Sequence, residues 1–440
     1  MANQASSHKS HTGLFYLVFV MYSYTTGGPF GLEDQVTSSG PGMTLIYHLV
    51  LPLLWCIPIS LISAELTTAM PVQGGFYRWT RAAFGDFWGF LAGFWNWLAS
   101  FLLGASYAVL FTDYLGFCFP AITGWKHYLI SVGLIAVITL INVLGIQTVG
   151  KLAMVLSFLI LLPVAIMCVM AVPKFHHNPF VPVVPPHAPL FQVFGVGLAL
   201  GLWLYSGYEQ LSTVAGEVDN PQRNYPIALA VVVPLSVATY FLPTFLALGA
   251  LGNWQDWHTR YFSDAALLIG GSWLGLGMTV AAVITFVSLL NSTVLASTRM
   301  PFAMAEDGYM SPLLTRLHPR FGTPWIAIIV SAAIYCVLAW HSLTQLISIY
   351  IWLRIATSLL TVLSGYRLRQ TRPEMPRAFR IPWGKKGLSY AVWAPVLMSG
   401  IALLGSDKFG LRWGPVGLVL GPLAYLFFRR RPEAKAEVAS

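Results

Sequence analysis

Apolar runs of about 20 residues recur along almost the whole chain, separated by short polar or glycine-rich stretches. A run of that length crosses a hydrocarbon layer ~30 Å thick as a helix. Strand-type alternation is absent, which argues against a barrel. The pattern predicts an all-α integral membrane protein with twelve transmembrane helices, at about 13–36, 43–66, 86–119, 127–147, 149–172, 190–215, 226–251, 272–298, 324–340, 343–366, 388–405 and 411–428.

Two of these runs are broken near their middle by residues that do not hold a helix. The first contains Thr25-Thr26-Gly27-Gly28-Pro29-Phe30-Gly31, and the sixth contains Ser206-Gly207-Tyr208-Glu209. Glycine permits backbone angles closed to other residues, and proline lacks an N–H donor. Broken backbone at membrane depth is tolerated only where it is buried in protein or lines a cavity. The matched pair of breaks therefore indicates the substrate site of a secondary transporter.

Spans one to five and six to ten form two halves of five. Because five is odd, the second half enters the membrane from the opposite side, and the broken helices become antiparallel partners. This arrangement is the 5+5 inverted repeat of the leucine-transporter fold, with discontinuous helices one and six. The predicted organisation is a tail at 1–12, a transport core at 13–366, a connector at 367–387, two further helices at 388–428 and a tail at 429–440.

Composition agrees with a membrane location. Hydrophobic residues make up 56% of the 440 residues and charged residues 9%, against about 25% charged in a soluble domain. The net charge of +9 raises the question of nucleic acid, but the basic residues are distributed as in a membrane protein. With twelve spans, 19 of them lie on the side of the termini and 5 on the other. The positive-inside rule then places both termini in the cytoplasm, in a protein of the cell (plasma or inner) membrane. The basic tail at 429–435 is expected to touch anionic lipid headgroups, and no nucleic acid is expected as partner.

No cofactor, metal site or enzymatic activity is expected. The four cysteines, Cys56, Cys118, Cys168 and Cys336, lie in or at the ends of apolar runs at unrelated spacings. His176-His177 follows a predicted span, in a proline-rich loop without nearby carboxylates. A membrane enzyme would need a cluster of acid, base or metal-binding groups at one membrane face, and no such cluster is evident.

Four stretches resemble the amino acid–polyamine–organocation superfamily of permeases. They are A-E-L-T-T-A-M-P-V-Q-G-G-F-Y-R-W (64–79), G-Y-E-Q-L-S-T-V-A-G-E-V-D-N-P-Q-R-N-Y-P-I-A (207–228), R-M-P-F-A-M-A-E-D-G-Y-M-S-P (299–312) with F-G-T-P (321–324), and G-G-P-F-G-L-E-D (27–34). The last resembles the polyamine–proton symporter branch more than the common G-S-G-I-F. The resemblance implies a small-molecule permease of that fold.

The resemblance also implies roles in the sixth span. Glu209 stands where the family couples protonation to substrate binding or release, and an intramembrane carboxylate normally faces a cavity, a partner or a proton path. Its alternative role is a structural hydrogen bond to the unwound backbone. Trp203 matches a family aromatic that stacks on substrate. Packing within the helix bundle is the alternative for Trp203.

In the first span, the helix after the break presents free N–H groups, which bind a carboxylate. A simple kink or close helix packing is the alternative. Glu33 and Asp34 follow the break and either hold an amine of a cationic substrate or face the outer vestibule. Glu65 and Glu217 are expected to form inner-gate or structural ion pairs, with residues such as Arg78 or Arg299.

Arg354 is the one basic residue inside a span, and we expect it to pair with an intramembrane acid. The loop at 252–271 is expected to form a partial lid. Sodium is not excluded as coupling ion, since the eighth span offers Ser288, Asn291, Ser292, Thr293 and Ser297. Some proton-coupled relatives carry a lysine in span five, where this chain has Ile160, so proton coupling through Glu209 or Glu33 is preferred.

The sequence thus predicts a permease for an amino acid or polyamine, working by alternating access and proton symport around a site between spans one, three, six, eight and ten. The alternatives are an exchanger of amino acid and amine, or a transporter-like nutrient sensor. The predicted substrate-binding residues are Thr26, Gly27, Gly28, Pro29, Phe30, Gly31, Glu33, Trp203, Ser206, Gly207, Tyr208 and Glu209.

Overall fold

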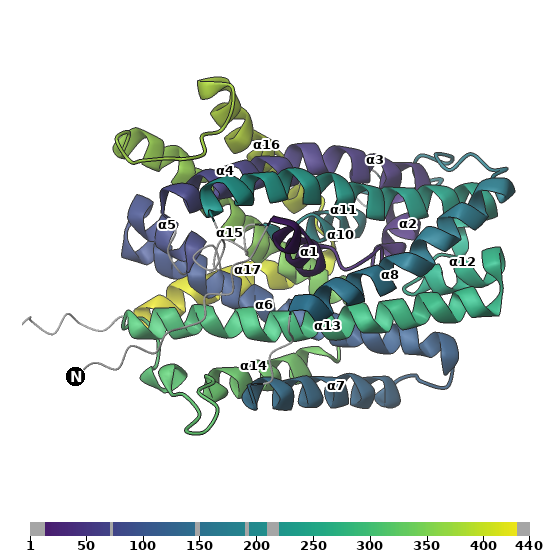
Figure 1. The fold of residues 1–440 in the computed structure, drawn as a ribbon, viewed down its shortest axis with the longest axis horizontal. Helices are drawn as coiled ribbons and strands as arrows, with labels where there is room; N and C mark the ends of the chain where they lie inside the picture. Colours follow the sequence, from purple (N-terminus) through teal and green to yellow (C-terminus); the bar gives the residue numbers. More distant parts are fainter. Residues whose placement is uncertain (1–13, 71–73, 146–149, 190–192, 209–219, 429–440) are drawn as a thin grey trace, which may run out of the picture.

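The computed structural model describes residues 14–70, 74–145, 150–189, 193–208 and 220–428, and these contain helices and no strand (Figure 1). The α-helices are α1 (Leu14–Thr25), α2 (Glu33–Ser39), α3 (Pro41–Leu51), α4 (Ile57–Ala69), α5 (Gly75–Phe84), α6 (Asp86–Cys118), α7 (Trp125–Val143), α8 (Gly150–Ala171), α10 (Val196–Leu204), α11 (Pro221–Leu251), α12 (Tyr261–Gly270), α13 (Ser272–Glu306), α14 (Trp325–Leu338), α15 (Leu343–Thr371), α16 (Gly384–Leu404) and α17 (Lys408–Phe428). The all-α prediction is confirmed for these residues.

Eight helices in the described part of the chain are long and apolar enough to cross a membrane. They correspond to the predicted spans two, three, four, seven, eight, ten, eleven and twelve. Span one is divided into α1 and α2, span six is described only from 193 to 208, and α14 of span nine has 14 residues. A multi-pass membrane protein is therefore supported, while the count of twelve and the inverted repeat stay predictions.

Local sequence explains where several helices begin and bend. The Ser342 side chain accepts a hydrogen bond from the N–H of Gln345, whose own side chain accepts one from Ser342, so a capping box starts α15. Between α3 and α4 the helix continues through a π-helical turn, Pro52–Cys56. Pro52 cannot donate to the regular helical ladder, and a π-turn accommodates the missing bond.

The long helices α6, α13 and α15 pack together and form the centre of the molecule. In Figure 1, α6 and α13 run along the long axis, while α1 is viewed nearly end-on between the other elements. α1 packs against α11 and α8, and α2 packs against α10. The two pieces of the first span therefore contact different helices, and the break between them lies at the centre of the molecule.

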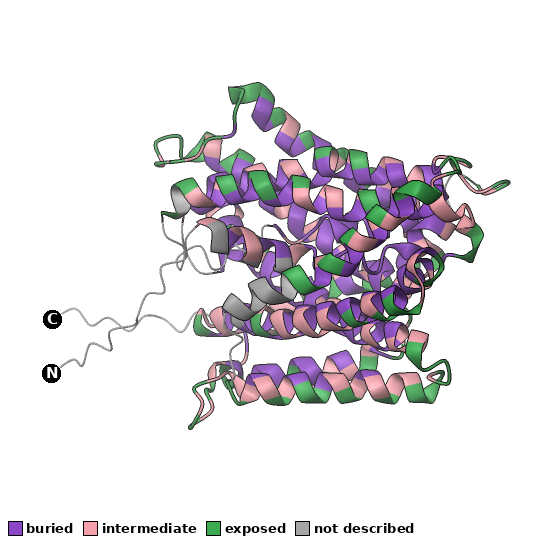
Figure 2. Ribbon diagram, turned by 45° about the vertical axis from the view of Figure 1, so that its right-hand side comes forward, coloured by how far each residue is buried: buried purple, intermediate pink, exposed green. Residues whose placement is uncertain are grey.

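Apolar side chains are exposed along the outer helices. Figure 2 shows buried residues concentrated inside, with exposed positions along the outward faces. On α7, Leu129, Val137 and Leu140 are each more than half exposed, and on α17 Phe427 is 83% exposed. A soluble protein rarely exposes so many large apolar side chains together, whereas lipid tails cover them readily.

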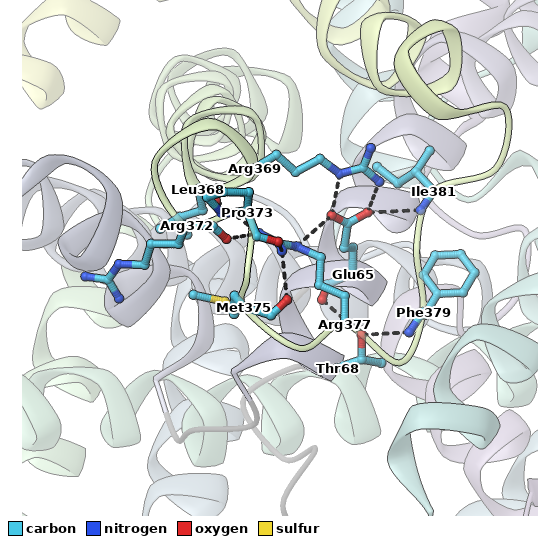
Figure 3. A network of polar contacts seen from close by, with 10 residues as sticks. All are labelled: Glu65, Thr68, Leu368, Arg369, Arg372, Pro373, Met375, Arg377, Phe379 and Ile381. Atoms are coloured by element: carbon cyan, nitrogen blue, oxygen red, sulfur yellow. Dashed lines mark hydrogen bonds and ion pairs between the residues drawn. The ribbon is translucent and has the colours of Figure 1, made fainter.

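The buried carboxylate of Glu65 links the C-terminal end of α4 to the connector at 367–387 (Figure 3). The Arg369 guanidinium donates to both carboxylate oxygens, from Nε to Oε1 at 2.6 Å and from Nη2 to Oε2. The Nε of Arg377 lies 3.3 Å from Oε1, and the N–H of Ile381 donates to Oε2 at 2.9 Å. One carboxylate thus joins α4, α15 and the connector.

The expected partners of Glu65 were wrong. The sequence interpretation paired it with residues such as Arg78 or Arg299, which flank neighbouring loops. Arg78 instead contacts Asp307, 2.9 Å away, just after α13. Arg369 and Arg377 lie some 300 residues from Glu65 along the chain, and only the fold brings them together. Glu217 and the side chain of Arg299 lie outside the described residues.

We expect Glu65→Gln to destabilise the protein by about 3 kcal/mol, because it leaves two largely buried guanidinium groups without their shared carboxylate. The measurement is the unfolding free energy of purified protein in detergent. Asp86→Asn is the matched control, since it removes the exposed ion pair of Asp86 with Arg81 and costs less than about 1 kcal/mol. Equal losses in both variants would contradict a structural role for Glu65.

Candidate functional site

A pocket lies at the centre of the molecule, where the two broken segments meet the intact helices. Its empty volume is about 900 Å³, including the space at its mouth. It is lined from α1, α6, α10, α11, α13 and α15 and from both breaks, by Thr25, Thr26, Phe30, Asn96, Ala99, Ser100, Leu103, Tyr107, Trp203, Leu204, Ser206, Gly207, Tyr240, Thr285, Phe286, Leu289, Ser292, Thr293, Ala296, Ser297, Tyr350 and Arg354. The predicted position between spans one, three, six, eight and ten coincides with this pocket.

The first break, between Thr25 and Glu33, exposes backbone groups that neighbouring side chains satisfy. The hydroxyl of Thr285 on α13 donates to the carbonyl of Gly27 at 2.7 Å. The N–H of Gly31 donates to the Glu33 carboxylate at 2.8 Å. Gly31 has φ +90°, and a Cβ there would lie 2.9 Å from the indole of Trp203. Glycine is therefore required both by backbone angle and by the close approach of the second broken segment.

The second break begins at Tyr205, after α10. The phenol of Tyr240 on α11 donates to the carbonyl of Leu204 at 3.3 Å, and that of Tyr225 donates to the carbonyl of Tyr208 at 3.1 Å. The indole N–H of Trp55, in the π-turn, donates to the hydroxyl of Ser206 at 3.1 Å. The π-turn thus has a consequence at the site, because Trp55 lies within it and reaches this break.

An aromatic layer closes one end of the pocket. Tyr107 on α6 lies between Trp203 and Phe286, with ring centroids 6.4 Å from each. Phe30, in the first break, lies edge-on to Phe286 at 6.3 Å and to Tyr114 at 5.4 Å. These rings offer flat apolar surfaces, and in the case of tyrosine and tryptophan a face that attracts cations.

Glu33 lies behind this layer. Its carboxylate is fully buried and accepts hydrogen bonds from the N–H of Gly31 and from the phenol of Tyr114. Tyr114 lies seven residues beyond Tyr107 on α6, about 10 Å along the helix axis. Phe30 packs against Tyr114 and lines the pocket, so its ring stands between the pocket and the Glu33–Tyr114 pair. Glu33 therefore joins the start of α2 to α6.

Arg354 on α15 contributes the one charged side chain among the described lining residues. It is 2% exposed, and its Nη1 donates to the amide oxygen of Asn96 on α6 at 3.5 Å. Asn96 is the eleventh residue of the 33-residue helix α6, and Tyr107 lies eleven residues further along. The pocket is thus cationic at one end and aromatic at the other.

The predicted site residues fall into three groups. Thr26, Phe30, Trp203, Ser206 and Gly207 line the pocket. The other predicted residues in the described chain do not line it and lie within or next to the breaks: Gly27, Gly28, Pro29, Gly31, Glu33 and Tyr208. Glu209 lies outside the described residues.

Several lining residues were missed by sequence reasoning. Asn96, Ser100 and Tyr107 lie at intervals of four and seven residues on α6, which places them on one helix face. That spacing, with Ala99 and Leu103 between them, is a signal the sequence contains. Tyr240 and Tyr350 carry no such signal, because each lies in a long apolar helix and the chain has 19 tyrosines.

Two other expectations concern neighbouring residues. Ser292, Thr293 and Ser297, named as sodium candidates, line the pocket, while Asn291 accepts a hydrogen bond from Asn142 at 2.8 Å. Ile160, at the position of the relatives' lysine, is buried, and its side chain would lie 3.1 Å from a Cβ at Gly28. Ile160 thus lies beside the first break.

The first turn of α2 also contacts the segment at 252–271. The Asp34 carboxylate accepts a hydrogen bond from Thr259 at 2.7 Å, so the segment is tied to α2. Asp113 pairs with His127 at 2.8 Å, and His258 with Asp264 at 3.4 Å. The side chain of Asp34 thus points to the outer surface rather than into the central pocket.

Comparisons with known proteins support a transport site. The model of a family described as "Amino acid permease" matches residues 13–416. A probable polyamine transporter of Arabidopsis thaliana is 33% identical over 422 residues, 94% of this chain and 86% of the relative. A polyamine transporter of Oryza sativa subsp. japonica is also 33% identical, over 94% and 78%. A serine/threonine exchanger of Bacillus subtilis is 27% identical over 84% and 85%.

The segment at 252–271, which contains the His258–Asp264 pair, is expected to become less stable as pH rises. Pairing of the His258 ring N–H with the Asp264 carboxylate raises the pKa of His258 above its usual value near 6.5. The pair therefore stabilises the fold fully below that value and is lost as pH rises through the folded pKa. We expect the protection factors of α12 amides, with the base-catalysed intrinsic exchange rate divided out, to fall between about pH 6 and pH 8. This pH dependence of protection should disappear in Asp264→Asn. Persistence of the dependence in Asp264→Asn, or its absence in the unaltered protein, would contradict this assignment.

Proposed function

Since this chain belongs to the amino acid permease family, within the amino acid–polyamine–organocation superfamily, we propose that it is a secondary active transporter that carries a polyamine or amino acid by alternating access through the central pocket. The family and the relatives support a membrane transporter rather than an enzyme. The observation that carries the proposal is the meeting of both helix breaks at one pocket, lined from six helices.

An amine is the substrate group that the pocket fits best. α1 and α10 both end at the pocket, at Thr25 and Leu204, and a helix C-terminus carries about half a negative charge. The aromatic faces of Trp203 and Tyr107 add attraction for an ammonium group of ~1–2 kcal/mol when desolvated. An ammonium group is expected at this end, away from Arg354.

For a substrate carboxylate, in contrast, the expected binding position is already occupied by a side chain of this protein. The N–H of Gly31, at the start of the second half of span one, already donates to Glu33. The chain supplies its own anion there, so a substrate without a carboxylate meets no unsatisfied donor at this N–H. This favours a polyamine over an amino acid, in keeping with the printed names of the plant relatives.

Proton coupling is proposed at Glu33 and Glu209. A proton on Glu33 weakens its acceptance of hydrogen bonds from Gly31 and Tyr114, which loosens the link between α2 and α6. Protonation would thereby favour movement of α2, the element beside the pocket. The role of Glu209 rests on its resemblance to the family's coupling acid. Sodium would use Ser292, Thr293 and Ser297, whose hydroxyls line the pocket.

The second candidate is an exchanger that swaps an amine for a related amino acid. It is favoured by the Bacillus relative, which is named an exchanger. A transporter-like nutrient sensor is the remaining alternative. In each case we propose a cell membrane location with both termini in the cytoplasm, from the distribution of basic residues.

The test is uptake by purified protein in liposomes, with two substrates that differ only by a carboxylate, putrescine and ornithine. We expect an inward proton gradient to drive putrescine uptake, with ornithine carried at least about tenfold more slowly, a preference of roughly 1.4 kcal/mol. Preferred ornithine uptake would overturn the amine assignment. Rapid counterflow with no effect of the gradient would establish the exchanger.

Glu33→Gln tests the coupling role. It should abolish the gradient's effect while counterflow of putrescine remains. Asp34→Asn is the matched control. It removes the same charge from the residue next to Glu33, and the carboxylate of Asp34 is bonded to Thr259 instead. A gradient effect that survives in Glu33→Gln would remove Glu33 from the proton path.

A further inference from the structure

The connector, residues 367–387, joins the ends of two membrane helices and therefore lies at the membrane surface. α15 runs into it as far as Thr371, and α16 begins at Gly384. Figure 2 shows it as a mostly exposed projection beyond the helix bundle, at the upper left of the view. The Glu65 contacts hold it in a defined position rather than as a free loop.

The exposed charge of the connector is strongly positive. Arg369 and Arg377 form ion pairs with Glu65. Five further basic side chains are exposed, against one exposed carboxylate, that of Glu374: Arg367, Arg372, Arg380, Lys385 and Lys386. None of the five has an ion pair with a carboxylate in the part of the chain that the structure describes. Their exposed positive charge can thus attract an anionic partner.

Trp383 stands among these charges. Its side chain is 77% exposed, and its backbone has φ +61°, a conformation that non-glycine residues rarely adopt. It is the residue immediately before α16, and Lys385 and Lys386 form the first turn of that helix. An exposed indole beside basic residues at the start of a membrane helix suits the boundary between headgroups and hydrocarbon.

We propose that this connector is a binding surface for anionic phospholipid headgroups, with Lys385, Lys386 and Arg380 contacting phosphate and Trp383 inserted at the headgroup level. The proposal goes beyond transport and depends only on the membrane location. Lipid bound here also bears on α15, since the helix that carries the pocket residues Tyr350 and Arg354 continues to Arg369 at the connector. Anionic lipid would thus reinforce the position that Glu65 sets.

The test is native mass spectrometry of the full-length protein in detergent, with phosphatidylglycerol or phosphatidylcholine added. We expect the unaltered protein to retain phosphatidylglycerol in preference to phosphatidylcholine. The variant Lys385→Gln/Lys386→Gln should weaken phosphatidylglycerol retention about fivefold for each lysine removed, while phosphatidylcholine retention is unchanged. Both lysines are exposed, so the melting temperature without lipid should match that of the unaltered protein.

The matched control is Lys408→Gln/Arg412→Gln, which removes two exposed positive charges from the first turns of α17. This control should keep the preference for phosphatidylglycerol. Equal retention of the two lipids by the unaltered protein would overturn the proposal, and so would an equal loss in the two double variants. Because the readout is lipid binding, failure of the transport proposal would leave this result unaffected.

Discussion

The structure depends on one constraint: backbone groups left unpaired by a broken helix inside a membrane must find partners in the protein. Here intact helices provide them. Thr285 reaches Gly27, Tyr240 reaches Leu204, and Tyr225 reaches Tyr208. Each such bond repays the desolvation of a buried peptide group that lipid cannot satisfy. The breaks are thus held open by side chains from α11 and α13.

That solution also creates the pocket. The helices that satisfy the breaks cannot fill the space between them, and what remains is lined by hydroxyls, aromatic rings, one amide and one guanidinium. Glu33 completes the first break from within its own segment and anchors it to Tyr114. A titratable group is thereby built into the support of the first break.

The sequence predicts the breaks and the pocket's location well, because glycine and proline in an apolar run have few structural outcomes. It predicts less well what lies around them. Glu33 was expected to meet substrate, but Phe30 stands in between, and the direction of a side chain after an irregular turn does not follow from spacing. Glu65 received the wrong partners because Arg369 and Arg377 are close to it only in the folded chain. The face of α6 formed by Asn96, Ser100 and Tyr107 was present in the sequence and was overlooked.

The most direct measurement of the central claim is substrate protection of a cysteine in the pocket. Ser292→Cys would be introduced into a chain whose Cys118, Cys168 and Cys336 are serine, leaving the buried Cys56. The account predicts that putrescine slows the modification of Ser292→Cys by a thiol reagent several-fold, and leaves a cysteine at the exposed Ser389 unaffected. Unchanged modification at 292 in a protein that still takes up putrescine would show that the substrate passes elsewhere.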